Sequence, residues 1–151
     1  MNITLMYNEL LYDIQSKNRA EVMGIPEPAT RYLAEAGAEK EDEIKRCMLD
    51  AFASLTLTCM RFLRGEVIPM DNEPEVPSYF EIDIIGSERR LGGKMSAIAD
   101  VMHSMLVNMT LSRFYLAVGQ SALSQTRDAL AAADVNSLKR LIYSKQPPIL
   151  I

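Results

Sequence analysis

Three residue types that often carry chemistry are scarce: the 151-residue sequence has no tryptophan, two cysteines and a single histidine. One histidine cannot complete a typical transition-metal site, and it is the only imidazole available for acid–base catalysis. Cys47 and Cys59 stand twelve residues apart on one expected helix. At about 1.5 Å per residue they are separated by about 18 Å, beyond disulfide reach. We therefore expect free thiols and no metal-based or triad-type active site.

Basic residues are also in short supply, with 16 Lys and Arg against 20 Asp and Glu, for a net charge of −4. Binding to nucleic acid or anionic membranes needs clustered Lys and Arg, so neither partner is expected. No stretch approaches the roughly 20 apolar residues that span a bilayer. The longest uncharged segment, Phe114 to Thr126, is interrupted by Gly119 and Gln120. The first residues also lack the basic start of a signal peptide, and we expect a soluble protein made in a cytosol.

Helical periodicity is what the sequence has in abundance. Ile3, Tyr7, Leu10 and Ile14 recur at spacings of three and four, which predicts an amphipathic helix. The segment from Lys94 to Val118 is apolar on several sides, which is typical of a central helix. The predicted helices are Asn2 to Val22, Glu27 to Ala36, Glu39 to Leu63, Lys94 to Val118, Ser121 to Ala132, and Val135 to Tyr143 after a capping Asp134.

The pattern changes between the third and fourth of these helices. Residues 65–78 hold three prolines and four acidic residues but no basic one, which predicts an exposed acidic loop. Tyr79 to Ile85 alternates apolar and acidic residues, as a half-buried strand does. Gly86-Ser87 can turn this strand back onto Glu88 to Leu91, so we expect a β-hairpin over residues 79–91. The predicted fold is mainly α: one domain over residues 1–151, a bundle of five or six helices with one small β-hairpin insertion.

Asp100 and His103 are the residues most suggestive of chemistry, because a spacing of three places both near one helical face. Carboxylate-x-x-His is half of the signature of di-metal carboxylate bundles, but the second histidine is missing. A satisfied interior or interface histidine is the simpler interpretation. An enzyme would have to use a helical pocket around Asp100, His103 and Arg113. We assign no catalytic, cofactor-binding or metal-binding residue, and we expect no cofactor.

Two features are candidates for contacts between subunits. Acidic side chains of the loop precede the strand, and basic side chains follow it. These charges form either two solvated faces or complementary surfaces that fix how neighbouring subunits align. Residues 147–151 form an apolar tail, which is either tucked into its own core or docked on a partner. The candidate contact residues are Glu66, Asp71, Glu73, Glu75, Arg89, Arg90, Lys94, Ile149, Leu150 and Ile151.

The order of these features resembles a family. A long helix with an acidic start, Glu41 to Leu63, is followed by the acidic loop, the strand start Tyr79-Phe80-Glu81-Ile82, and a long apolar helix through Arg113-Phe114-Tyr115. An Ala-rich helix, Asp128 to Ala133, and a basic ending, Leu138-Lys139-Arg140 to Pro147, complete the pattern. It resembles small head–tail connector or neck proteins of tailed phages, particularly prophages of gut Bacteroidetes. Phe114-Tyr115 stands where that family is expected to carry tryptophan.

The resemblance implies a virion structural protein that forms a ring and catalyses nothing. Its partners would be copies of itself and neighbouring virion proteins, with assembly in the cytoplasm of the host bacterium. The alternative is a cytosolic helical interaction module, such as a regulator or adaptor, located in the cytoplasm.

Overall fold

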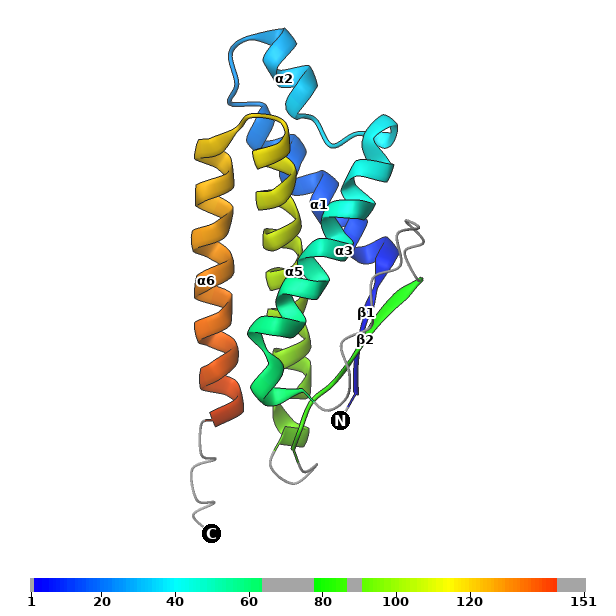
Figure 1. Ribbon diagram of the computed structural model, residues 1–151, viewed down its shortest axis with the longest axis vertical. Helices are drawn as coiled ribbons and strands as arrows, with labels where there is room; N and C mark the ends of the chain where they lie inside the picture. Colours follow the sequence, from blue (N-terminus) through cyan, green and yellow to red (C-terminus); the bar gives the residue numbers. More distant parts are fainter. Residues whose placement is uncertain (1, 64–77, 87–90, 144–151) are drawn as a thin grey trace.

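The computed structural model describes residues 2–63, 78–86 and 91–143 (Figure 1). Within these ranges the chain forms five α-helices and one two-stranded antiparallel sheet, which confirms the predicted mainly α bundle. The helices are α1 (Tyr7–Val22), α2 (Pro28–Ala34), α3 (Glu41–Thr58), α5 (Met95–Ala117) and α6 (Ser121–Tyr143), and the strands are β1 (Asn2–Met6) and β2 (Tyr79–Asp83). Short 3₁₀ turns, Ala38–Lys40, Met60–Phe62 and Gly92–Lys94, stand beside α3 and before α5.

The apolar helix α5 is the centre of the bundle, as its sequence predicts. It packs against α6, α3, α1 and β1. Figure 1 shows α6 running beside α5 along most of its length, while α3 crosses α5 obliquely. Met102, Met105 and Leu106 are fully buried on α5, and Tyr115 is buried near its C-terminal end. A helix contacted on so many sides has little room for a polar face, which explains its continuous apolar sequence.

The first residues form a strand, so the predicted helix start at Asn2 is wrong. β1 pairs with β2 in antiparallel register, with Ile3 opposite Ile82 and Leu5 opposite Phe80, and all four side chains are buried. The strand predicted from Tyr79 onward is therefore present, and within the described residues its partner is β1. Leu91 is buried just before the turn that leads into α5, and residues 88–90 lie outside the described residues. Five residues are too few to separate helical spacing from strand alternation.

Two predicted C-terminal helices are one continuous helix, α6. Asp134 was expected to cap a new helix, yet it lies inside α6. Its Oδ2 accepts hydrogen bonds from Ser104 Oγ at 2.9 Å and from Asn108 Nδ2 at 2.8 Å. The carboxylate is therefore satisfied by the neighbouring helix, and nothing interrupts the backbone ladder of α6.

A polar seam joins α5 to α6. Ser104, Asn108 and Ser112 recur every four residues and so share one face of α5. Ser112 Oγ donates to Asp128 Oδ1 at 2.6 Å, and Asn108 Oδ1 accepts from Arg127 Nη1 at 2.8 Å. Each pairing couples a defined position of α5 to a defined position of α6, so the seam fixes the register of these helices.

Candidate functional site

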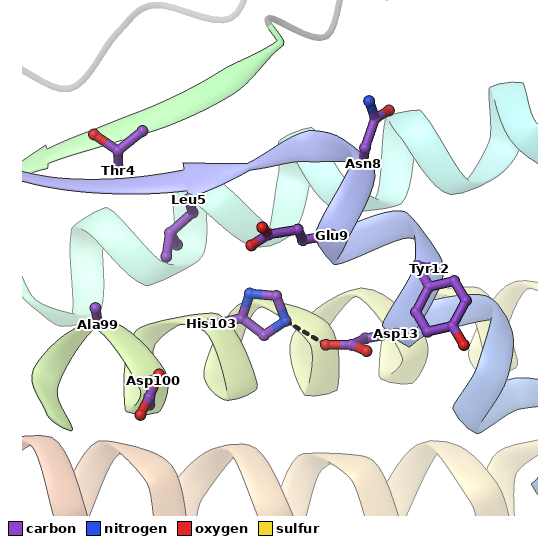
Figure 2. Close-up of a pocket in the computed structure, with 9 residues that line it drawn as sticks. All are labelled: Thr4, Leu5, Asn8, Glu9, Tyr12, Asp13, Ala99, Asp100 and His103. Atoms are coloured by element: carbon purple, nitrogen blue, oxygen red, sulfur yellow. Dashed lines mark hydrogen bonds and ion pairs between the residues drawn. The ribbon is translucent and has the colours of Figure 1, made fainter. Parts of the chain in front are cut away.

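An open pocket of about 580 Å³ lies where β1 and α1 meet the first turns of α5. Its polar lining includes Glu9 and Asp13 from α1 and Asp100 and His103 from α5. His103 donates a hydrogen bond from Nε2 to Asp13 Oδ2 at 2.5 Å. Figure 2 shows Glu9 extending over the imidazole ring, whereas Asp100, one turn earlier on α5, points away from it. The pocket thus places two carboxylates, those of Asp13 and Glu9, beside the single histidine.

Among the residues that the structure describes, the pocket shows neither a Ser- or Cys-based triad nor a metal-binding cluster. Neither serine nor cysteine is among its nine lining residues, so the Asp13–His103 pair has no partner of the kind that a Ser or Cys triad requires. No group of three or more His, Cys, Asp and Glu side chains within the described ranges is placed to hold a metal ion. The arrangement therefore offers an acidic recess with one imidazole ring.

Arg113 does not line the pocket that contains Asp100 and His103. It lies farther along α5 in a different depression, where its Nη2 donates to Ser54 Oγ of α3. The three residues that an enzyme was expected to use are thus divided between two surfaces. The cysteines offer no substitute, because burial raises the pKa of the Cys47 thiol and raises that of Cys59 to about 11. Both thiols are protonated at neutral pH and are weak nucleophiles.

Lys94 is the one predicted contact residue that lies within the described ranges. Its Nζ donates to the Leu141 carbonyl at 3.2 Å, which places the ammonium group in the last turn of α6. A cation there interacts favourably with the carbonyl end of a helix. The other candidate contact residues lie outside the described residues: Glu66, Asp71, Glu73, Glu75, Arg89, Arg90, Ile149, Leu150 and Ile151.

A second depression, which we call the α3–α6 groove, runs over α5 between α3 and α6 and encloses about 450 Å³. Its lining is mostly apolar or small, with the Arg113 and Asp128 side chains as its charged groups. The lining residues are Ser54, Thr58, Met109, Ser112, Arg113, Leu116, Ser124, Asp128, Ala131, Ala132 and Val135. Such a mixture suits an apolar segment whose backbone meets a few fixed polar groups.

Large apolar side chains are exposed at both ends of the bundle. The upper end in Figure 1 holds α2 and the C-terminal end of α1, and the exposed residues there are Met23, Tyr32 and Leu33. At the lower end, Ile85 donates its N–H to the Phe62 carbonyl, and the Phe62 ring contacts Tyr143 at 5.1 Å between centroids. Met60, Ile85 and Tyr143 are exposed there. Single exposed apolar residues are ordinary, whereas several gathered on one surface are typical of an interaction site.

Sequence reasoning missed a buried polar network around Glu21 of α1 and Arg127 of α6. Arg127 donates from Nε to Glu21 Oε1 at 2.8 Å, and a second contact joins its Nη2 to the same oxygen. Tyr115 donates its hydroxyl to Glu21 at 3.2 Å, and Asn18 donates to that hydroxyl at 3.3 Å. Asn18 also bonds the Ala34 carbonyl and the Ala36 N–H beyond α2. The network ties the α1 and α2 end to α5 and α6.

The chain matches no protein-family model, no curated protein and no solved structure.

Among the residues that the structure describes, no helix combines the length and the apolar character needed to cross a membrane.

Proposed function

We propose that this protein is a structural component that assembles by end-to-end contact between copies of itself, forming a ring in the virion of a tailed phage or prophage. The observation that carries the proposal is the pair of exposed apolar groups at opposite ends of the bundle. Leu33 is 59 % exposed at the upper end and Met60 is 58 % exposed at the lower end. Burying either side chain against a partner is worth about 1.5–3 kcal/mol.

End-to-end contact pairs two different surfaces, the lower end of one copy with the upper end of the next. Such a contact is heterologous, and it closes into a ring when the rotation between neighbours permits. The interior supports this use. Every buried side-chain nitrogen and oxygen in the described ranges has a hydrogen-bond partner within the chain. The order of elements, which resembles small head–tail connector or neck proteins, is the support for a virion ring and for neighbouring virion proteins as further partners.

The test uses two surface variants, Leu33→Asp for the upper end and Met60→Asp for the lower end. A charge at either end should weaken self-association of that variant at least about tenfold, because the apolar contact is lost. Mass photometry should show higher oligomers for the unmodified protein and monomers for each variant alone. An equimolar mixture should form dimers only, because one intact upper end and one intact lower end remain for each pair.

Leu130→Asp is the matched control, because Leu130 is exposed on α6 away from both ends. It should assemble as the unmodified protein does. Dimers formed by either end variant alone would show that like ends pair, and the head-to-tail proposal would be wrong. A monomeric unmodified protein at all concentrations would refute self-assembly and favour the alternative, an interaction module for other proteins.

A further inference from the structure

We infer that residues 144–151 of one copy bind in the α3–α6 groove of the neighbouring copy. The inference rests on the proposed end-to-end assembly, and it identifies the chain segment that would reinforce each contact. Its starting point is that an apolar chain segment and a groove with apolar side chains are both available. Ile149, Leu150 and Ile151 form an uninterrupted apolar run. The groove offers apolar side chains to such a run: Met109, Leu116, Ala131, Ala132 and Val135.

The groove can hold an extended apolar segment. Met109 and Val135 supply apolar walls, while Ala131 and Ala132 are small enough to let a backbone approach α6 closely. The Arg113 guanidinium group reaches from α5 toward α3, and it has donors beyond the one used by Ser54. A peptide in the groove would therefore find apolar contacts for its side chains and a fixed donor for its carbonyl oxygens.

The two helices that flank the groove, α3 and α6, are not parallel. α3 and α6 converge at the lower end of the bundle, where the ring contact between Phe62 and Tyr143 bridges them. They diverge toward the upper end, as Figure 1 shows, and there the groove lining ends at Leu116, which is 67 % exposed. A segment entering from above passes the exposed Leu116 side chain, whereas one entering from below meets the Phe62–Tyr143 pair.

The end of the bundle at which α6 finishes favours the groove of the neighbouring copy as the binding site. Residues 144–151 follow Tyr143, at the lower end of their own bundle. In an end-to-end assembly this end abuts the upper end of the next copy, where the groove lining of that copy ends. To enter its own groove, the segment would have to reverse direction and pass over the Phe62–Tyr143 pair. The neighbour's groove requires no such reversal.

The lengths are compatible. Residues 144–148 span at most about 18 Å when extended, and Pro147-Pro148 favours an extended backbone before any binding. The α6 side of the groove, from Ser124 to Val135, is about 17 Å long. Residues 149–151 add about 10 Å, so residues 144–151 together reach about 28 Å, which is longer than the groove.

The first experiment measures binding without requiring assembly. The receptor is the full chain with Ile149, Leu150 and Ile151 each changed to Ser, and the probe is a fluorescent peptide of residues 144–151. We expect saturable binding by fluorescence anisotropy, weakened at least about tenfold when the peptide carries the same three serines. Ala132→Trp in the receptor should weaken binding equally, because it fills the groove. Ala133→Trp, an exposed substitution away from the groove lining, should not.

The second experiment asks which copy supplies the groove. A photo-crosslinking benzoylphenylalanine replaces Leu150 in the full chain, and the products are mapped by mass spectrometry. We expect crosslinks between chains, to Met109, Ala132 or Val135. Crosslinks within one chain, or to any other surface, would overturn the inference, as would a peptide that does not bind. Because oligomers are scored separately by mass photometry, rings without a groove crosslink would refute this inference and leave the assembly proposal standing.

Discussion

Two charged pairs connect α1 with the C-terminal helices, and they differ in how much water reaches them. Glu21 and Arg127 have side chains that are 19 % and 10 % exposed, and Tyr115 and Asn108 complete their hydrogen bonds. Asp13 and His103 have side chains that are 40 % and 22 % exposed, at the edge of an open pocket. The first pair is enclosed and fully partnered, whereas the second remains accessible.

This difference separates a structural role from a surface role. Removing one partner of an enclosed ion pair leaves the other charge without compensation in a poorly solvated place, which is costly. Removing one partner of an exposed pair lets water replace it, which costs little. We therefore expect the Glu21–Arg127 network to hold the α1 and α2 end on the bundle. The Asp13–His103 pair should contribute little to stability.

The largest expected effect is that of Arg127→Met. It removes the guanidinium group from Glu21 and Asn108 while keeping most of the side-chain volume, and we expect the free energy of unfolding to fall by about 2–4 kcal/mol. Urea denaturation followed by circular dichroism measures it. The control is the double variant Glu21→Gln with Arg127→Met, which removes both charges and should recover part of the loss. A loss below about 0.5 kcal/mol for the single variant would show that the network is not structural.

An intermediate effect is expected for Tyr115→Phe. The substitution removes the hydroxyl that donates to Glu21 and accepts from Asn18, and a loss of about 1 kcal/mol is typical for such a bond. Both partners keep other hydrogen bonds, so neither is stranded.

The pH dependence of the same variant gives a second measurement. Burial, with the Glu21 carboxylate next, raises the pKa of Tyr115, so the folded state holds this proton at pH values where the unfolded chain loses it. Stability is therefore complete below about pH 10, where an unfolded tyrosine titrates, and falls as pH rises above it. Tyr115→Phe should make this alkaline loss smaller. It should not abolish the loss, because burial and the Glu41 carboxylate raise the pKa of Tyr7 to about 12. An identical alkaline profile in variant and parent would contradict the assignment.

Much of the fold could be predicted because it follows from local patterns. The apolar periodicity of α5 and the alternation of β2 reflect the faces that these elements bury. β1 was missed because Ile3 and Leu5 fit a strand only when a partner is known, and that partner is about 77 residues away in sequence. The junction at Asp134 was misread for a similar reason. Asp is a good helix cap, so the sequence alone favours a helix start there. The structure shows that the Asp134 carboxylate instead accepts a hydrogen bond from Ser104 of α5.

The site was less predictable than the fold. Asp100 and His103 were placed correctly on one helix, but Asp13, the actual partner of His103, comes from 90 residues earlier. Arg127 and Glu21 are 106 residues apart, and no spacing rule joins them. One local signal was available: Ser104, Asn108 and Ser112 interrupt an apolar helix every four residues, which indicates a polar seam facing another helix. Assembly surfaces leave no comparable periodic signal, because exposed apolar residues are common on any protein.

The smallest effect is expected where the pocket is open. His103→Gln removes the imidazole that bonds Asp13, and it should lower the free energy of unfolding by less than about 1 kcal/mol, because water can solvate the freed carboxylate. A double-mutant cycle that combines His103→Gln with Asp13→Asn gives the coupling energy between these two side chains. The matched cycle combines Glu21→Gln with Arg127→Met. Both are measured by urea denaturation at the same pH. We expect a coupling energy below about 1 kcal/mol for the first cycle and a clearly larger one for the second. Equal coupling energies would mean that solvent access does not separate the two pairs. A larger value for Asp13 and His103 would make the open pocket, and not the enclosed network, the contact that holds α1 against α5.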